Sequence, residues 1–444
     1  MSEMLWAKNL PLDERLHAFT VGNDPITDLQ LLPFDAEGSA AHARMLGERG
    51  LLPLAEAKAL VAALHELKAE AERGELTITR EQEDGHTTLE AALTVRLGDT
   101  GRRIHLARSR NDQVQTALRL LMRARLLDLA QTLHRSAMAF VEFGEKHAAS
   151  PLPGYTHMRR AMPSSWQMWS SAFAEGLLEE LEQAPALWLR LDRSPLGAAA
   201  GFGTPVPLDR ERSAELLGFA RVQRSPIDVM NARGRHEQAL AAWIVSAAGT
   251  LEKAIWDLLI WSTEEFGFVR LPDAFTTGSS LMPQKRNPDV LELARGRCRE
   301  LRGLANHLSH LTGGLPSSYH RDHQLLKAPL LEITAKAQEL FEVIAHLLPG
   351  LEVDGAACTA ACTKELHAAN EACRLAAEGM PFRDAYATVA RQLQDGSFAP
   401  AATASNGCDQ DVSTLAEELR QNSVWITERR QFLADTTARL FDWP

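Results

Sequence analysis

The stretch Thr277-Gly278-Ser279-Ser280-Leu281-Met282-Pro283-Gln284-Lys285-Arg286-Asn287-Pro288-Asp289 is the most informative part of this 444-residue chain. Its glycine and two prolines disfavour continuous regular structure, so we expect a loop here. Two serines follow the glycine, and Lys285 and Asn287 add a cation and an amide. Such a loop can surround an anion, and one of its serines can act as an acid or base once a ligand orders it. The alternative is a polar surface loop.

A second polar cluster, residues 105–113, directly precedes a long helical pattern. Because apolar residues then recur every three or four positions, we expect a helix from near Asp112 toward Glu145. Free backbone N–H groups, Arg110 and Asn111 would converge at its N-terminus and form a carboxylate site. The alternative is a simple N-cap with solvated arginines. The apolar positions are Leu118, Met122, Leu126, Leu129 and Leu133.

Two further segments carry histidines beside hydroxyl or acidic residues. Residues 83–90 are either a ligand site or a helix start, with Asp84 as the cap and Glu90 solvated. Residues 151–157 break the long helix and place His157 before another helix, which we expect to be capped at Ser164-Ser165. His157 has two readings. It lies either in a ligand-facing turn with Thr156 or in a loop where the histidine is incidental.

The chain as a whole has a mainly α-helical pattern without a strand-dominated region or a repeat. Helices are expected over 55–72 and 237–266, and the second is apolar on most sides. That helix would lie in the middle of a bundle or at an oligomer interface. We divide the chain into a mostly helical N-terminal domain over 1–111, a central long-helix bundle over 112–349 and a small C-terminal domain of shorter helices over 350–444.

Composition excludes several classes of protein. A hydrophobic fraction of 45% and a charged fraction of 24% are ordinary for a folded globular chain, and the net charge of -11 argues against nucleic acid as a partner. An anionic substrate therefore needs a local positive cluster. No signal segment or membrane-length apolar run occurs, so we expect a cytoplasmic protein without a membrane partner. We also expect no metal and no cofactor.

The five cysteines are odd in number and sparse, which disfavours a disulfide framework. Cys358 and Cys362 lie one helical turn apart and could bind a metal together with His367. Burial in the core is the favoured reading of both cysteines.

The motif Gly-Ser-Ser-x-Met-Pro-x-Lys-x-Asn-Pro at residues 278–288 resembles the signature of the fumarase, aspartase and argininosuccinate lyase superfamily. Residues 109–113, Ser-Arg-Asn-Asp-Gln, are most similar to argininosuccinate lyases, and the likeness extends from Ser39 to Tyr386. The resemblance implies a three-domain helical fold and a homotetramer whose central helices form a twenty-helix core. It also implies active sites built from three chains. Because long helices separate their ends, we expect Ser279 and His157 to reach one site from different subunits.

The same resemblance implies a reaction, the reversible cleavage of argininosuccinate into arginine and fumarate. Ser279 matches the general base, and His157 matches the position of acid catalysis through water. Glu292 matches the carboxylate partner that would raise the pKa of His157, and Lys285 would stabilise developing negative charge. The expected substrate-binding residues are Ser109, Arg110, Asn111, Thr156, Asn287, Tyr319, Gln324, Lys327, Asp84, His86 and Arg233.

Some residues depart from the family pattern. Residues 5–9 replace the usual Trp-Gly-Gly-Arg-Phe, and Leu325-Leu326 replaces a common acidic pair. After His157 the departures are Met158, Arg159 and Met162. These changes leave open an N-acylated argininosuccinate or another fumarate-releasing substrate. A catalytically silent, crystallin-like structural protein is a third possibility, against which the retention of the four matched catalytic residues argues.

Overall fold

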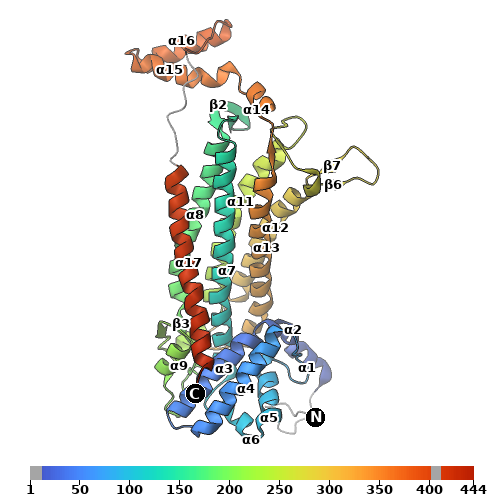
Figure 1. The fold of residues 1–444 in the computed structure, drawn as a ribbon, viewed down its shortest axis with the longest axis vertical. Coiled ribbons are helices and arrows are strands. Elements are labelled where there is room, and N and C mark those ends of the chain that lie inside the picture. Colours follow the sequence, from blue (N-terminus) through green and yellow to red (C-terminus); the bar gives the residue numbers. More distant parts are fainter. Residues whose placement is uncertain (1–12, 402–411) are drawn as a thin grey trace.

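The computed structural model describes residues 13–401 and 412–444, so the departure at residues 5–9 and the thiol of Cys408 lie outside the described residues. The described chain is mainly helical, as predicted from the sequence, and its long helices lie along one axis (Figure 1). A group of shorter helices lies at each end of this long bundle. No helix within the described ranges is long and apolar enough to cross a membrane.

The bundle is organised around α7, which begins at the residue after the Ser109 cap. The predicted stripe from Leu118 to Leu133 is buried, because it packs against α8 and α13. On the other side of α8, α11 packs against α12. The long helices are α7 (Arg110–Lys146), α8 (Trp166–Leu191), α11 (Arg235–Trp261), α12 (Asp289–Leu311) and α13 (Lys327–Gly350).

The apolar helix predicted over 237–266 corresponds to α11, which ends at Trp261, five residues earlier than expected. Its stripe from Leu240 to Leu258 is buried, but Trp256 is 40% exposed in the single chain. Leu293 of the neighbouring α12 is 74% exposed. The bundle therefore leaves large apolar side chains on its surface around α11 and α12.

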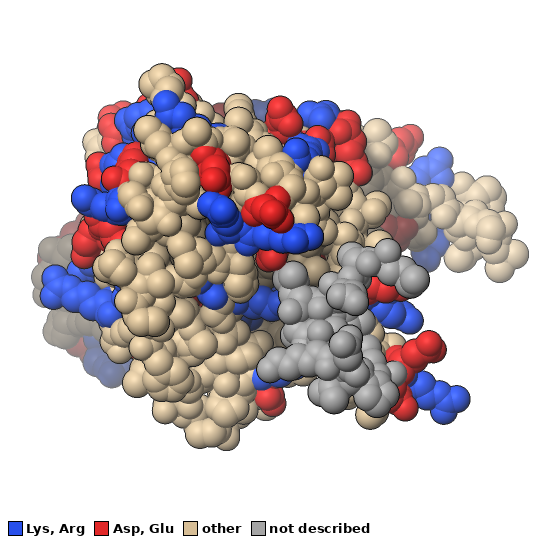
Figure 2. Space-filling model, turned by 90° about the horizontal axis from the view of Figure 1, so that it is seen from below, with Lys and Arg blue, Asp and Glu red and all other residues tan. Residues whose placement is uncertain are grey.

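The N-terminal helices form a second apolar core beside the start of α7. Within it, α4 matches the predicted helix over 55–72 and buries the face from Ala57 to Leu67. Seen from this end, charges of both signs are mixed along the upper part of the described surface, while its lower left part shows few charged side chains (Figure 2). The elements are α1 (Glu14–Val21), α2 (Asp24–Thr27), η1 (Asp28–Gln30), α3 (Leu32–Glu48), α4 (Leu54–Glu72), α5 (Gly85–Leu97), α6 (Asp99–Arg102) and η2 (Arg103–His105).

Strands occur only as four short pairs in the described chain. The largest pair joins β1 (Pro151–Thr156) to β2 (Arg159–Ser165) in an antiparallel hairpin at the far end of α7. The predicted break after α7 is confirmed, although the sequence did not predict a hairpin there, and Ser165 caps α8 as expected. The other pairs are β3 (Arg193–Ser194) with β4 (Arg221–Val222), β5 (Val269–Arg270) with β8 (Glu352–Val353), and β6 (Thr277–Gly278) with β7 (Arg286–Asn287).

The C-terminal part separates into two places. α14 packs on β1, and α15 and α16 pack on each other at the same end of the molecule (Figure 1). α17 (Val412–Phe441) runs back along α7 and α8 for 30 residues. The expectation of only shorter helices after residue 350 is therefore wrong for α17, which buries Ala416, Leu419 and Ile426 against the bundle. The remaining elements are α9 (Arg210–Leu216), α10 (Pro226–Asn231), η3 (Asp273–Phe275), η4 (Arg321–Leu326), α14 (Gly355–Ala361), η5 (Lys364–His367), α15 (Ala368–Ala377) and α16 (Phe382–Gln394).

Candidate active site

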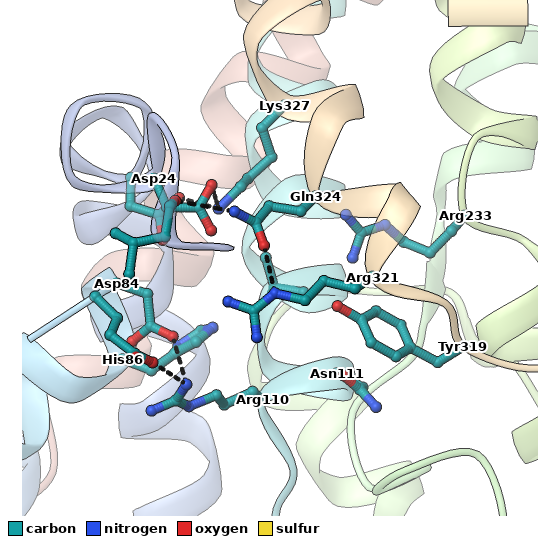
Figure 3. Close-up of a pocket in the computed structure, with 14 residues that line it drawn as sticks. Asp24, Asp84, His86, Arg110, Asn111, Arg233, Tyr319, Arg321, Gln324 and Lys327 are labelled. Carbon is teal, nitrogen blue, oxygen red and sulfur yellow. Dashed lines mark hydrogen bonds and ion pairs between the residues drawn. The ribbon is translucent and has the colours of Figure 1, made fainter. Parts of the chain in front are cut away.

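A cavity of about 190 Å³ lies where the N-terminal helices meet the bundle (Figure 3). Most of the predicted substrate-binding residues line it, although they come from segments more than 200 positions apart. These are Asp84, His86, Arg110, Asn111, Arg233, Tyr319, Gln324 and Lys327. Six lining residues that we did not predict are Val21, Asp24, Asp28, Glu83, Val114 and Arg321.

The N-terminus of α7 forms one wall of the cavity. The predicted start near Asp112 is confirmed to within two residues, and Ser109 is the cap. The backbone N–H of Asn111 donates to Ser109 Oγ at 3.3 Å, and the N–H of Ser109 donates to Asp112 at 3.1 Å. The capping alternative is therefore right for Ser109. It is incomplete for Arg110, whose side chain is partly exposed but donates to Glu83 and to Thr87, both at 3.0 Å.

Asp84 caps a helix, as one reading of its sequence context expected, and it also lines the cavity. Its carboxylate caps α5 by accepting the Thr87 N–H at 2.9 Å, and it also lies 3.4 Å from the Arg110 guanidinium. Glu90 is not solvated as the capping alternative expected. It is half-buried, 3.7 Å from His105, and burial raises the pKa of its carboxyl. The acidic segment is thus folded against the start of α7.

Lys327 forms the base of the cavity. Its ammonium lies 2.5 Å from Asp28 and 2.8 Å from Asp24, so two carboxylates neutralise it before any ligand binds. Burial outweighs the attraction of Lys327 and raises the pKa of Asp24 to about 6. Gln324 is also occupied, because its side-chain amide donates to the backbone oxygens of Thr20 and Val21 at 3.0 and 2.9 Å.

Two arginines complete the positive side of the cavity. Arg233 is buried, donates to the backbone oxygen of His323 at 2.9 Å and lies 3.8 Å from Glu237. Arg321 donates to the Gln324 amide oxygen at 3.1 Å and to Thr20 at 2.9 Å. Arg321 lies two residues after Tyr319. We did not predict it from the sequence, because we named only the residues that match known family positions.

His86 lies in the cavity wall with its side chain 9% exposed. Its Nδ1 is 2.5 Å from a carboxylate oxygen of Asp35 on α3. Burial opposes a charge on this ring, but the attraction of Asp35, Asp84 and Asp28 outweighs it and raises the pKa of His86. These carboxylates therefore favour the cationic form of the His86 ring.

The loop with Ser279 and Lys285 projects from the bundle between β6 and β7 (Figure 1). Ser279 is half-buried, and its Oγ accepts hydrogen bonds from the backbone N–H groups of Leu281 at 3.3 Å and Met282 at 3.1 Å. Ser280 and Lys285 are exposed. The Asn287 side-chain amide donates to the Gly278 oxygen at 3.4 Å and so closes the base of the loop.

The hairpin places Thr156 and His157 at its exposed tip. His157 and Met158 form the two-residue turn with φ of 51° and 60°. Glu292 is exposed in the first turn of α12. Among the described residues no ion pair or hydrogen bond joins His157 to Glu292, so the pair that the resemblance implies is not formed within one chain.

The predicted site residues therefore fall into separate groups. The cavity lies at the start of α7 and the hairpin follows its end, and 37 residues at about 1.5 Å each separate these ends by roughly 55 Å. The Ser279 loop lies toward the hairpin end, because β5 pairs with β8 and the following α14 packs on β1. Helix length thus separates the cavity from both catalytic candidates. Our expectation that it separates Ser279 from His157 is wrong, since both lie toward the same end.

Among the residues that the structure describes, no group of three or more His, Cys, Asp or Glu side chains could hold a metal ion. Cys358 is buried and Cys362 half-buried, in agreement with the core reading. Cations, amides and backbone N–H groups are therefore what the site offers to an anionic ligand.

Comparison with known families agrees with this arrangement of motifs. A family model described as Lyase matches residues 9–303. This range covers more than half of the chain and contains the cavity wall at Arg110, the hairpin and the Ser279 loop. The chain therefore belongs to this lyase family.

More specific relatives come from several bacteria. The argininosuccinate lyase of Sorangium cellulosum is 42% identical over 395 residues, which cover 88% of this chain and 91% of that protein. The argininosuccinate lyase of Thermotoga neapolitana is 39% identical over 396 residues, covering 88% of this chain and 98% of that protein. Within the lyase family the chain is a member of the argininosuccinate lyases, which confirms the resemblance read from the sequence.

Solved structures with lower sequence identity to this chain have the same fold. An EDDS lyase in complex with formate superposes with a TM-score of 0.77 at 22% identity and covers 100% of this chain and 95% of that chain. The class II fumarase of Schistosoma mansoni gives a TM-score of 0.73 at 17% identity, with 93% of each chain covered. The predicted superfamily fold is thereby confirmed.

Proposed function

We propose that this protein cleaves argininosuccinate reversibly by β-elimination, giving arginine and fumarate. The observation that carries the mechanism is the position of Ser279 Oγ, which receives two backbone N–H donors within an exposed loop. This is an arrangement that stabilises an oxygen bearing negative charge. The membership in the argininosuccinate lyases supplies the substrate.

The first step removes a proton from the succinyl carbon next to a carboxylate. Ser279 is the proposed base, and the N–H groups of Leu281 and Met282 stabilise its alkoxide. Removal of the proton leaves an enolate-like dianion, which needs positive charge close to the carboxylate oxygens. Lys285, six residues from Ser279 on the same loop, supplies this charge once the loop folds over the substrate.

The second step breaks the bond between the succinyl carbon and the guanidinium nitrogen. His157 donates a proton to the departing nitrogen through water, and Glu292 of another chain supports the protonated ring. Exposure of both side chains in the single chain supports this assignment, because a partner can reach them. Thr156 and Asn287 lie beside these two groups and bind the substrate there.

The cavity at the start of α7 binds the rest of the substrate. Its wall presents cationic groups from Arg110, Arg233, Arg321 and Lys327 beside carboxylates from Asp24, Asp28, Glu83 and Asp84. Argininosuccinate carries carboxylates and also a guanidinium and an amine, so a wall of both signs suits it better than a purely basic one. Asn111 and Tyr319 add neutral hydrogen-bonding groups.

A homotetramer brings these groups together in this proposal. One chain holds the cavity and the catalytic candidates toward opposite ends of a helix of roughly 55 Å, so a complete site needs neighbouring chains. Exposed apolar residues such as Trp256 and Leu293 support an interface along α11 and α12. The same proposal includes the division of the chain into three domains, with boundaries after residues 111 and 349. It also includes a cytoplasmic location.

An N-acylated argininosuccinate is the second candidate substrate. Met158 is 74% exposed directly beside His157, where the sequence departs from the family. An apolar side chain at this position suits an acyl group on the amino end of the substrate. Arg159 follows it on β2 and is also exposed.

The deciding experiment measures fumarate release by absorbance with purified protein. Argininosuccinate, N-acetylargininosuccinate and adenylosuccinate are compared at equal concentrations. The proposal expects the highest kcat/KM with argininosuccinate. A higher value with the acetylated compound would establish the second candidate, and no release from any of them would favour a catalytically silent protein.

A further inference from the structure

Behind the cavity, α3 directs a row of polar side chains into the protein interior. Asp35, Ser39 and His42 follow one another at helical spacing, and each is at most 3% exposed. Ser39 accepts a hydrogen bond from Arg108 at 2.8 Å, and His42 is bonded to the backbone oxygen of Leu106 at 2.9 Å. Asp35 alone among the three reaches a side chain in the cavity wall, namely His86.

The contact between Asp35 and His86 fixes the direction of the imidazole ring. Nδ1 is buried and lies 2.5 Å from the Asp35 carboxylate. The ring as a whole lines the cavity. Because the two ring nitrogens point in different directions, anchoring Nδ1 on α3 leaves Nε2 as the nitrogen available to a ligand.

The geometry points to Asp35 as a positioning residue that aims His86 Nε2 at a carboxylate of the substrate and keeps the ring a cationic donor. This inference rests on the proposed function and assigns a role to a residue that does not itself line the cavity. A carboxylate behind an imidazole selects the tautomer and orientation of the ring, as second partners of functional histidines commonly do.

The other charges around His86 decide how strongly Asp35 is needed. Asp84 at the start of α5 and Asp28 in η1 also favour the cation. The positive groups nearby are Arg108 before the cap of α7, Arg110 at its start and Lys327 on α13, and the ring of His105 in η2 is coupled to that of His86. Arg110 and Lys327 are paired with Asp84 and Asp28 respectively. With these pairs formed, Asp35 has the largest effect of the three carboxylates on the pKa of the His86 ring.

A purely structural role for Asp35 makes a different prediction. If the carboxylate only stabilised the packing of α3 on α5, its loss would lower activity equally at every pH. If it acts through His86, its loss lowers the pKa of the ring, and activity is then lost at a lower pH than in the wild type. The direction of this change follows because the His86 cation is present below the pKa of the ring and is lost as the pH rises through that pKa.

The test compares kcat/KM against pH for the wild type and Asp35→Asn. We expect the alkaline fall to move down by about one to three pH units, the usual effect of one opposite charge at this distance. Asp35→Glu should restore part of the shift, because it keeps the charge. Ser39→Ala is the matched control on the same buried face, and its profile should keep the wild-type position. An unmoved fall in Asp35→Asn would overturn the inference.

A double-mutant comparison identifies the route of the effect. In a His86→Gln background the further change Asp35→Asn should alter kcat/KM by less than about twofold, because the ring through which it acts is gone. An undiminished effect of Asp35→Asn in that background would contradict the inference.

A direct titration keeps the inference testable if Asp35→Asn does not fold or if argininosuccinate is not the substrate. The ring signal of His86 is assigned in the wild-type NMR spectrum by its absence in His86→Gln. We expect the pKa of the ring to lie above its ordinary value, and a pKa at or below that value would refute the role of Asp35. Absence of fumarate release together with a raised pKa would count against the proposed function alone.

Discussion

Replacement of Ser279 by alanine is the most direct test of the mechanism. It removes the oxygen that accepts the N–H groups of Leu281 at 3.3 Å and Met282 at 3.1 Å. A positioned general base contributes about 10²- to 10⁴-fold, and one donor to a developing oxyanion contributes about 3 kcal/mol. Since the base and both donors act through this one oxygen, we expect kcat to fall by at least about three orders of magnitude. That loss corresponds to about 4 kcal/mol of transition-state stabilisation.

The assay follows fumarate by absorbance and separates kcat from KM. Ser279→Ala should keep KM near that of the wild type, because the loop contributes the proton transfer rather than most of the binding. Circular dichroism and light scattering should give unchanged helix content and mass. Ser280→Ala is the matched control, since Ser280 is the exposed neighbour, and it should stay within about tenfold of the wild type. The reasoning would be refuted if Ser280→Ala were the more damaging change.

Three further predictions concern assembly and stability. Light scattering should give four times the mass of one chain, and a fully active monomer would contradict the composite site. The inactive variants Ser279→Ala and Asn111→Ala should regain about a quarter of wild-type activity after their subunits are mixed and exchanged, because each site then draws its two residues from two random chains. If no activity returned after confirmed exchange, both residues of a site would come from the same chain. Arg123→Met should lower the free energy of unfolding by about 3 to 5 kcal/mol in urea denaturation, because it leaves the Asp192 carboxylate, 3.0 Å from Arg123, buried without its cation. The control Arg125→Met removes a partly exposed arginine and should cost less than about 1 kcal/mol, and equal losses in the two variants would refute the argument.

Helical periodicity was a sufficient guide to the bundle. The three- and four-residue spacing from Leu118 to Leu133 located α7, and the same pattern located α4 to within one residue. The pattern could not show that α17 is a long helix, because most of its surface is polar and only one narrow side packs against α7 and α8. Where a helix buries only a narrow stripe, periodicity gives a weak signal.

The cavity was only partly predictable for a related reason. Polar clusters marked Asp84, His86 and Arg110 as candidates, since each lies beside a helix start. Nothing in the local sequence indicated that Lys327 would be neutralised by Asp24 and Asp28, about 300 positions earlier in the chain. Such pairings arise when the bundle brings distant helix ends together. The sequence therefore indicated which residues carry chemistry but not which of their charges are already satisfied.

The sequence did not predict the turn conformation at the hairpin tip, and this conformation bears on function. Two-residue hairpin turns with positive φ at both positions are normally built from asparagine and glycine, so residues 157 and 158 gave no signal for one. The structure nevertheless holds His157 at φ 51° and Met158 at φ 60°, a conformation that costs about 1 to 3 kcal/mol for such residues. Neither side chain recovers this cost by burial, because Met158 is 74% exposed and His157 is exposed as well. The strained turn is therefore explained best by what it presents, a histidine exposed at the tip of the hairpin, as the proposed role of His157 requires.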